Sequence, residues 1–259
     1  MYIHNLNPII FDFGILSLRW YSLAYLFGIV LGWWYGRKIV LSINKKNNKS
    51  YRIDLFDEYI TYIIISIILG GRIGYIIFYN LSYFVANPLE IFFIWNGGMS
   101  FHGGLLGIII ATFYFSKKNN FDKLILLDIV ACVAPIGIFL GRLANFINGE
   151  LFGKPTDLPW GVIFPKIDEL SRHPSQIYEA FLEGTLLFII LNTFINRSKY
   201  TKGKCAALFL IFYSVFRIIS EIFREPDLQV GYILNYISMG SLLSLFMMFA
   251  GIIMYLKIK

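Results

Sequence analysis

Residues 20–38 read WYSLAYLFGIVLGWWYGRK and indicate a membrane-spanning helix. The part Trp20–Gly36 carries no Lys, Arg, Asp or Glu, and two basic residues follow it at once. A helix needs about 20 mainly apolar residues to cross the hydrocarbon core of a membrane, so a run of this length is expected to span. The runs Ile91–Ser116 and Val230–Leu256 are equally free of these charged residues, and each is expected to span a membrane alone.

The composition of the whole chain agrees with a membrane protein. Of its 259 residues, 57% are hydrophobic and only 15% are charged, whereas about a quarter are charged in a typical soluble domain. One membrane domain is expected, residues 1–259. The net charge of +7 forms no basic stripe interleaved with aromatic residues, so no nucleic-acid partner is expected. No Lys or Arg lies within Met1–Leu18, so we expect the first span to be retained rather than cleaved as a signal peptide.

Four shorter apolar runs are each interrupted by charge on one side: Tyr59–Gly71, Ile129–Gly141, Gly184–Asn196 and Cys205–Phe216. Such runs occur in buried soluble helices as well as in membrane spans, so length alone leaves between three and seven spans. The loops favour seven, because Lys and Arg concentrate on the cytoplasmic side of a membrane protein. Basic residues cluster in alternate connecting segments: six in Arg37–Arg52, three in Lys117–Lys123, four in Arg197–Lys204 and two in Lys257–Lys259.

This alternation predicts an all-α membrane protein with seven transmembrane helices, its N-terminus outside and its C-terminus in the cytoplasm. The predicted spans are approximately residues 19–37, 57–80, 96–117, 124–147, 176–196, 205–223 and 231–256.

The charges that interrupt the four shorter runs share one depth in this arrangement. Arg72, Arg142 and Arg217 follow the apolar parts of three outward-running spans, and Glu179 and Glu183 precede the apolar part of an inward-running span. A single Arg near a helix end commonly extends to the interface and needs no other role. Ionisable residues from four helices at one depth favour a shared cavity, since such residues usually mark a site or a pathway.

The segment GRLANFINGELFG, residues 141–153, is the densest group of polar residues. Arg142 and Asn145 share a helical face, and Glu150 and Gly153 follow within the same segment. A planar guanidinium suits a phosphate, and glycine lets a backbone approach a ligand closely. The pattern indicates a site for an anionic lipid headgroup. The alternative is a helix C-terminus at which Asn and Gly act only as caps.

His102 lies among glycines in GGMSFHGGLLG, residues 97–107. Histidine takes up a proton near neutral pH, and the flanking glycines would let a substrate chain come close, so His102 is a candidate general base. A hydrogen bond that packs two helices is the alternative, and the pattern leaves both open. The histidines and cysteines have no metal-ligand spacing, so neither a metal nor another cofactor is expected.

Arg217 and Glu221 share a helical face, with Arg224 a turn further on. An internal ion pair is the simplest role for them. A carboxylate beside an Arg also holds the guanidinium in position for a second anion, so the same pair is compatible with phosphate binding. His173, in RHPSQIYE at residues 172–179, is open to a structural or a catalytic role.

Taken in order, these motifs give the chain a family resemblance. It resembles the bacterial phosphatidylglycerol–prolipoprotein diacylglyceryl transferases along almost its whole length. The motifs that carry the resemblance are RWYSLAYLFG (19–28), GGRIGY (70–75), GGMSFHGGLLG (97–107), GRLANFINGELFG (141–153), RHPSQIYE (172–179) and FRIISEIFREPD (216–227).

The resemblance implies transfer of the diacylglyceryl group of phosphatidylglycerol to the thiol of a lipobox cysteine in the signal peptide of a preprolipoprotein. The products would be a thioether and glycerol phosphate. It implies a multi-pass protein of the bacterial inner, cytoplasmic membrane with its active site toward the periplasm. The family's functional residues carry over to Tyr21, His102, Arg142, Asn145, Glu150, Gly153, Arg217 and Glu221.

Within that reaction we expect Arg142 and Arg217 to hold the lipid phosphate and His102 to help deprotonate the thiol. Asn145 and Glu150 would orient the headgroup. Tyr21 and Arg72 are expected to close the cavity, from their position alone. A transporter of lipid or small solutes is the main rival, and it would need polar residues opening toward both faces of the membrane.

Overall fold

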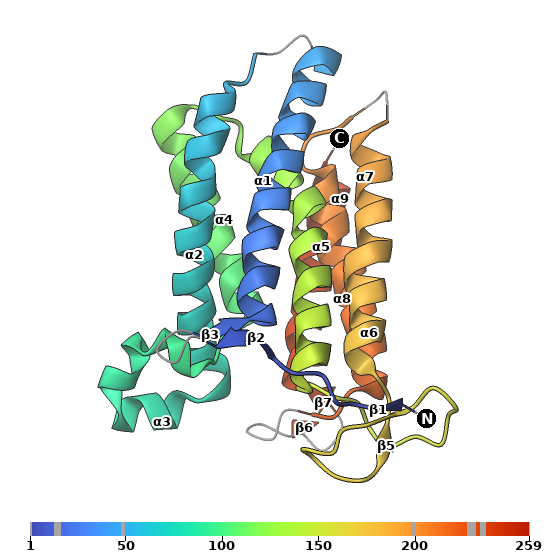
Figure 1. The fold of residues 1–259 in the computed structure, drawn as a ribbon. Coiled ribbons are helices and arrows are strands. Elements are labelled where there is room, and N and C mark those ends of the chain that lie inside the picture. The colour runs from blue at the N-terminus through green and yellow to red at the C-terminus, as the bar shows by residue number, and fades with distance from the viewer. Residues whose placement is uncertain are drawn as a thin grey trace.

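A computed structural model gives the arrangement of the chain and describes residues 2–12, 17–47, 50–197, 200–226, 232–233 and 237–258. Long helices run side by side along one axis (Figure 1). Those in one piece are α1 Trp20–Asn47, α2 Ile53–Tyr79, α4 Phe101–Asn119, α5 Lys123–Asn148, α8 Lys204–Phe223 and α9 Met239–Lys257. A further long helix joins α6 Ser175–Glu179, the π-helical segment η3 Ala180–Leu186 and α7 Leu187–Ile195.

Six helices of the described residues are long and apolar enough to cross a membrane, namely α1, α2, α5, the composite α6–η3–α7 helix, α8 and α9. The prediction of a helical membrane protein is therefore confirmed. α4 covers much of the third predicted span but is not among the six, because His102, its glycines and its polar end SKKN lower its mean hydropathy. The number of seven spans and the orientation stay predictions.

Two helices begin later than the predicted spans. α4 begins at Phe101 rather than at residue 96, because Gly97 and Gly98 have φ angles of 84° and 80° that a right-handed helix does not allow. α9 begins at Met239. Residues 231 and 234–236 of the seventh predicted span lie outside the described part of the chain.

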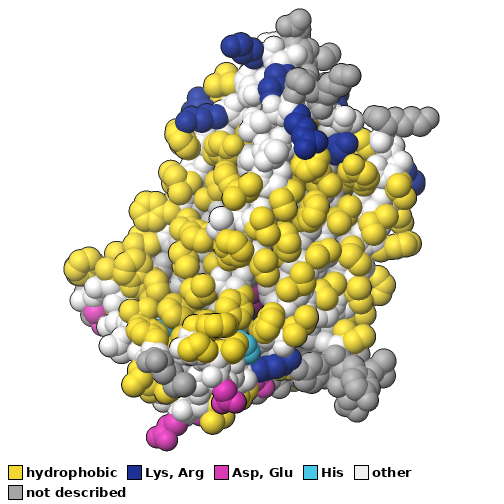
Figure 2. Space-filling view, turned by 90° about the vertical axis from the view of Figure 1, so that its right-hand side faces the viewer, with side chains coloured by type: hydrophobic (Ala, Val, Ile, Leu, Met, Phe, Trp, Pro, Cys, Tyr) yellow, Lys and Arg dark blue, Asp and Glu magenta, His cyan; other side chains and the backbone are white. Residues whose placement is uncertain are grey.

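The two ends of the bundle differ in charge. One end, called here the basic end, holds the last turns of α1, α4 and α9 with Lys45, Lys46, Lys117, Lys118 and Lys257. Figure 2 shows most of the visible Lys and Arg at this end and hydrophobic side chains over the middle of the molecule. Large apolar side chains in this middle zone are more than half exposed, among them Leu26, Ile65, Ile110 and Phe246. An exposed apolar surface of this extent fits lipid rather than water.

The opposite end, called here the strand end, carries short strands and the N-terminus (Figure 1). The strands are β1 Tyr2–Ile3, β2 Ile9–Asp12, β3 Ser17–Arg19, β4 Val162–Ile163, β5 Ser171–Arg172, β6 Tyr232–Ile233 and β7 Ile237–Ser238. β1 pairs in parallel with β4 and β4 in antiparallel with β5, while β2–β3 and β6–β7 are antiparallel pairs. His4 follows β1 and anchors it to the bundle, since its Nε2 lies 2.7 Å from the carbonyl oxygen of Phe146.

A side arm extends from the strand end between α2 and α4. It consists of α3 Leu81–Ala86 and the 3-10 helices η1 Pro88–Phe92 and η2 Ile94–Asn96, and Figure 1 shows it projecting beside the bundle.

α2 and α4 pack closely because glycines line their contact. A Cβ built on Gly70 would lie 2.5 Å from the carbonyl oxygen of Gly103, and one built on Gly74 would lie 2.5 Å from the Cα of Gly103. Small residues let membrane helices approach to backbone contact. Gly103 and Gly107 thus serve helix packing, and the substrate access expected of the glycines beside His102 stays a prediction.

Candidate active site

Two arginines and two glutamates from three helices form the centre of the site. On α5, Arg142 places Nη1 2.8 Å from Glu179 Oε2 and Nη2 3.0 Å from Glu183 Oε2. On α8, Arg217 places Nη1 3.2 Å from Glu179 Oε2 and 3.6 Å from Glu183 Oε1. Both glutamate side chains are fully buried. The two guanidinium groups therefore lie side by side over one pair of carboxylates.

The π-helical segment helps to set this geometry. Glu179 ends α6 and Glu183 lies within η3. A π-turn inserts an extra residue into a helix and is frequent at functional sites. Next to it, a Cβ on Gly184 would lie 2.6 Å from the Cβ of Phe139. The absence of a side chain there lets α5 pack against η3, which brings Arg142, one turn after Phe139, to the glutamates.

Residues of α8 and α9 close the other side of the cluster. Arg217 Nη2 also pairs with Glu221, and Arg224 Nη1 lies 3.6 Å from Glu179 Oε1. A Cβ on Gly240, near the start of α9, would lie 2.8 Å from Glu221 Oε1 and 3.3 Å from Arg217 Nη2. Gly240 therefore lets α9 approach this ion pair.

The charges of the cluster balance. Arg142, Arg217 and Arg224 face Glu179, Glu183 and Glu221, which gives three positive and three negative charges. Burying so many ions is costly even when they are paired, so a buried cluster of this kind is weak as a device for stability alone. A guanidinium carries five N–H donors. Arg142 uses its two terminal nitrogens on carboxylates, which leaves further N–H groups for another anion.

Asn145 and Glu150 are joined at the end of α5. The Asn145 side-chain amide donates to Glu150 Oε1 over 2.8 Å, and that of Asn148 donates to the same oxygen over 3.2 Å. Gly149 ends the helix in the left-handed region with a φ of 70°. The Gln176 side-chain amide then fixes the turn by donating to the Glu150 carbonyl oxygen over 2.7 Å. Gly149 thus caps α5, as the alternative for residues 141–153 expected of a glycine there, and Glu150 is held by two amides.

Gly153 lies in the chain that follows α5, at the strand end of the bundle. Its N–H donates to the carbonyl oxygen of His173, and it forms an isolated bridge with Arg224. A Cβ on Gly153 would lie 2.6 Å from the Cβ of His173 and 2.7 Å from the carbonyl oxygen of Phe223. Close chain packing at this position therefore requires glycine, and lipid binding by Gly153 stays a prediction.

His102, in the first turn of α4, lies close enough to Arg217 for the positive charge of the arginine to act on it. The neighbouring Phe101 ring stacks on Tyr213 of α8 with 4.3 Å between ring centroids. Since Tyr213 precedes Arg217 by about one helical turn, this stack ties the start of α4 to the arginine side of α8. His102 Nε2 is buried and has no hydrogen-bond partner within the described part of the chain. An unpaired buried nitrogen of this kind calls for a ligand or a water molecule.

Tyr21 lies on α1 beside Tyr25, with 3.5 Å between their hydroxyl oxygens. Tyr25 is within electrostatic range of Arg142 and Glu150. Tyr21 therefore contacts a side chain on which the charges of Arg142 and Glu150 act, and its role in closing the cavity stays a prediction.

Arg72 serves a different region. Its guanidinium donates to backbone carbonyl oxygens of the side arm and the segment after it: Glu90, Ile91, Phe93, Gly97 and Gly98. The ring of Phe84 lies 4.9 Å from its Cζ. Arg72 therefore holds the arm against α2, and a role in closing the cavity stays a prediction.

Charged residues also organise the loop between α5 and α6. Arg172 donates to Asp168 over 2.5 Å and to the carbonyl oxygen of Gly153 over 3.1 Å. The hydrogen bond from Arg172 holds the pKa of the Asp168 carboxyl below its usual value. Burial, with a smaller contribution from Lys154, lowers the pKa of His173. His173 Nδ1 lies 3.3 Å from the Tyr178 hydroxyl oxygen, a contact between this loop and α6 rather than one in the arginine cluster.

Arg142 and Arg217 were predicted to share one depth and Glu221 to share a helical face with Arg217, and the structure joins all three in one cluster. Sequence reasoning treated Glu179 and Glu183 only as depth markers, whereas they are the direct partners of both arginines. Their spacing of four residues, which places both on one face of a helix, was the available signal. Tyr25, Tyr213 and Gly240 were missed, because only the fold brings them to the site. Within the described residues, no three His, Cys, Asp or Glu side chains come together as a metal site.

Comparison with known proteins gives a consistent result. The prolipoprotein diacylglyceryl transferase family matches residues 8–257. Proteins of Rickettsia felis and Rickettsia bellii, both named phosphatidylglycerol–prolipoprotein diacylglyceryl transferase, are each 50% identical, over 95% and 98% of this chain and 95% of their own lengths. The protein of that name from Rickettsia canadensis is 49% identical over 95% of both chains. The chain therefore belongs to the prolipoprotein diacylglyceryl transferase family.

Proposed function

We propose that this protein transfers the diacylglyceryl group of phosphatidylglycerol to the lipobox cysteine thiol of preprolipoproteins. Membership of the family, and half-identical relatives whose names state both substrates, support this activity. The observation that carries it within the molecule is the buried cluster of Arg142 and Arg217 on Glu179 and Glu183, since lipid phosphate is the anion such donors suit.

The chemistry of the products defines what the site must do. A thioether forms when the cysteine sulfur bonds to the glyceryl carbon, and the bond between that carbon and its phosphate oxygen breaks. The phosphodiester carries one negative charge, and the departing glycerol phosphate gains a second. The thiol loses its proton, because the thiolate is the nucleophile. The site therefore needs cationic donors at the phosphate and an acceptor for one proton.

In this proposal Arg142 and Arg217 bind the phosphate and stabilise the charge that develops as it leaves. Glu179, Glu183 and Glu221 hold the two guanidinium groups in place before the lipid arrives. His102 accepts the thiol proton through its unpaired Nε2.

The remaining candidate residues would bind or enclose the lipid. Asn145 and Glu150, linked by their hydrogen bond, would contact the glycerol hydroxyls of the headgroup. Gly153 would let the backbone approach the headgroup. Tyr21 and Arg72 would close the cavity on its α1 and α2 sides.

We further propose that all seven long helices of this single domain cross the inner membrane of the bacterial cell. Lys118, at the end of α4, lies 3.7 Å from Glu58 near the start of α2, which supports a full crossing by α4. The two termini lie at opposite ends of the bundle (Figure 1), which fits an odd number of crossings. The positive-inside rule would place the basic end and the C-terminus in the cytoplasm, and the strand end and the site toward the periplasm.

The direct test incubates the purified full-length protein with phosphatidylglycerol labelled in its acyl chains and a lipobox peptide. We expect label on the peptide cysteine, and none when that cysteine is replaced by serine. Absence of label on the cysteine peptide would overturn the proposal. Movement of labelled lipid across proteoliposomes without transfer would favour a transporter instead.

A further inference from the structure

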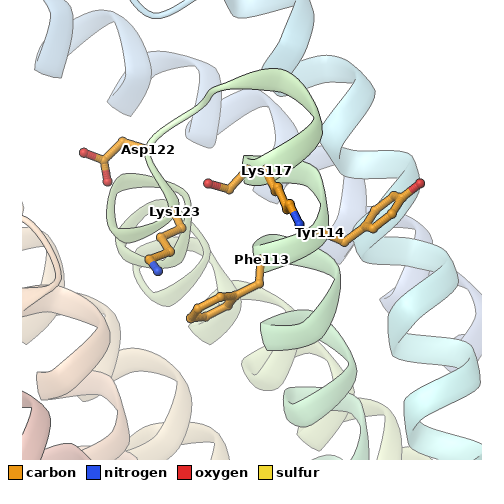
Figure 3. Close-up of a pocket in the computed structure, with 6 residues that line it drawn as sticks. Phe113, Tyr114, Lys117, Asp122 and Lys123 are labelled. Carbon is orange, nitrogen blue, oxygen red and sulfur yellow. The ribbon is translucent and has the colours of Figure 1, made fainter.

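A crevice of about 650 Å³ opens at the basic end between α4 and the start of α5. It is lined by Phe113, Tyr114, Ser116, Lys117, Asp122 and Lys123. Figure 3 shows the Lys123 side chain extending toward the Phe113 ring, while Asp122 points away from it. This crevice lies at the opposite end of the bundle from the arginine cluster, so it is a separate feature.

The charges around the crevice leave an excess of two cations. Asp122 is committed elsewhere, because one oxygen accepts the backbone N–H of Leu124 over 3.0 Å and the other lies 2.5 Å from Lys202 Nζ. Lys118 is committed to Glu58 and to the hydroxyl of Tyr62.

Lys117 and Lys123 remain at the crevice, and among the described residues neither has an ion-pair partner. Lys123 Nζ lies 4.4 Å from the centroid of the Phe113 ring, a cation–π contact that holds it over the crevice.

An apolar strip continues from the crevice along α4. Leu106, Ile110, Phe113 and Tyr114 repeat at helical spacing, so they share one face. Each of them is at least 47% exposed. The strip leads from the lysines toward the middle of the bundle, where the surface is apolar. Two cations at the end of such an apolar strip match a phosphate group with acyl chains attached. A free phosphate has no apolar part that could contact the strip.

We propose that this crevice binds an anionic phospholipid, with its phosphate at Lys117 and Lys123 and an acyl chain along the exposed face of α4. Basic pockets between membrane helices on the side rich in Lys and Arg are suited to anionic headgroups. This lipid would be a resident of the basic-end leaflet rather than the transferred substrate. The inference does not depend on the proposed reaction.

The test titrates the full-length protein in detergent with dioleoyl phosphatidylserine and measures bound lipid by native mass spectrometry. The double variant Lys117→Gln/Lys123→Gln is expected to weaken the first binding event roughly thirtyfold, since each lysine contributes about 1 kcal/mol to attraction of an anionic lipid. The charge-retaining variant Lys117→Arg/Lys123→Arg should bind as the wild type does. Dioleoyl phosphatidylcholine should bind equally to all of them.

Lys38→Gln/Lys45→Gln is the matched control, because it removes two charges from the same end and Lys38 also lies over an aromatic ring, that of Trp34. It should weaken binding less than twofold. If the control lost as much lipid affinity as Lys117→Gln/Lys123→Gln, general surface charge would explain the effect and the proposed site would be overturned. Unchanged lipid binding in Lys117→Gln/Lys123→Gln would also overturn it. Displacement of the lipid by 10 mM inorganic phosphate would assign the crevice to free phosphate instead. Transfer activity should stay unchanged in every variant.

Discussion

Glu179 is the residue on which the arginines of the candidate site converge. Its carboxylate lies within 3.6 Å of guanidinium nitrogens from Arg142, Arg217 and Arg224, and its side chain is fully buried. Before lipid binds, an arginine without such a partner would be an isolated charge in an apolar surrounding, which is strongly unfavourable. Glu179 therefore acts as a positioning residue, through the arginines rather than on the lipid.

Replacing Glu179 by Gln is predicted to damage the site more than the same replacement of an exposed glutamate would. The change keeps the shape but leaves three arginines facing two carboxylates, and breaking a buried ion pair costs about 3–5 kcal/mol. We expect a lower melting temperature in detergent and a transfer rate reduced by about two orders of magnitude. Glu169→Gln, an exposed glutamate in the loop before α6, is the matched control and should change neither. Wild-type stability and turnover in Glu179→Gln would contradict the positioning role.

His173 gives the loop before α6 a dependence on pH. Burial and Lys154 lower its pKa in the folded protein relative to the unfolded chain, so the neutral form is the one the fold favours. Stability is then fully present above the unfolded pKa of about 6.5 and decreases as the pH falls below it. Thermal melts between pH 8 and 5 should show this decrease, and His173→Gln should make the slope shallower. An identical slope in the variant would refute the assignment.

At the scale of elements, glycine placement determines how α2 and α4 pack. The motif GGRIGY contributes Gly70 and Gly74, and the motif around His102 contributes Gly103 and Gly107. Because the backbones touch, the position of His102 relative to the other helices depends on this contact. The same glycines thus connect the packing of two helices to the position of the candidate base.

Gly103→Ala is predicted to destabilise the protein, whereas Gly104→Ala is not. An added Cβ at Gly103 would lie 2.6 Å from the Cα of Gly74, with no flexible side chain to yield. At Gly104 the nearest atom, the carbonyl oxygen of Ile67, is 3.8 Å away, an ordinary contact. Overpacking costs about 1–3 kcal/mol, so Gly103→Ala should lower the melting temperature. Equal melting temperatures for the two variants would exclude the tight helix contact.

The sequence predicted helices well and their junctions poorly. Apolar runs of about 20 residues leave little alternative to a helix in lipid, since every backbone polar group must be satisfied within the segment. The π-helical segment at Ala180–Leu186 has no comparable signal in the sequence, and in the structure it packs closely against α5 at Gly184. Strands of two residues, such as β4 and β5, are too short for any periodic pattern.

The sequence predicted at what membrane depth the residues of the candidate site lie, but not which of their side chains pair with one another. Charge breaks placed Arg142, Arg217 and the two glutamates at one level, as the cluster requires. Which carboxylate meets which arginine depends on helix rotation, and that rotation is set by side-chain fits such as Gly184 against Phe139. Arg72 shared the depth of the others, yet its donors face backbone carbonyls of the side arm.

At the scale of the whole molecule, charge and apolar surface are arranged along one axis. Lysines gather at the basic end and exposed apolar side chains cover the middle (Figure 2). The arginine cluster lies near the strand end, where α5 and α8 end. The lysines would keep the basic end in the cytoplasm, because Lys and Arg are retained on that side during insertion. With that orientation, the arginine cluster would lie at the level of the outer leaflet, and lipid would meet the arginines there.

The orientation is testable with single cysteines in a variant whose buried Cys132 and Cys205 are replaced by Ala. Cysteines at Lys45, Lys117 and Lys257 should react with an impermeant maleimide only after spheroplasts are opened, whereas one at Asp157 should react in intact spheroplasts. Lys117 is the decisive position, because it shares a side with Lys45 only if α4 crosses the membrane. Labelling of Lys117→Cys in intact spheroplasts, with Lys45→Cys protected, would reject the seven-span arrangement. Labelling of all three basic-end positions in intact spheroplasts, with Asp157→Cys protected, would reverse the orientation and move the proposed site to the cytoplasmic leaflet.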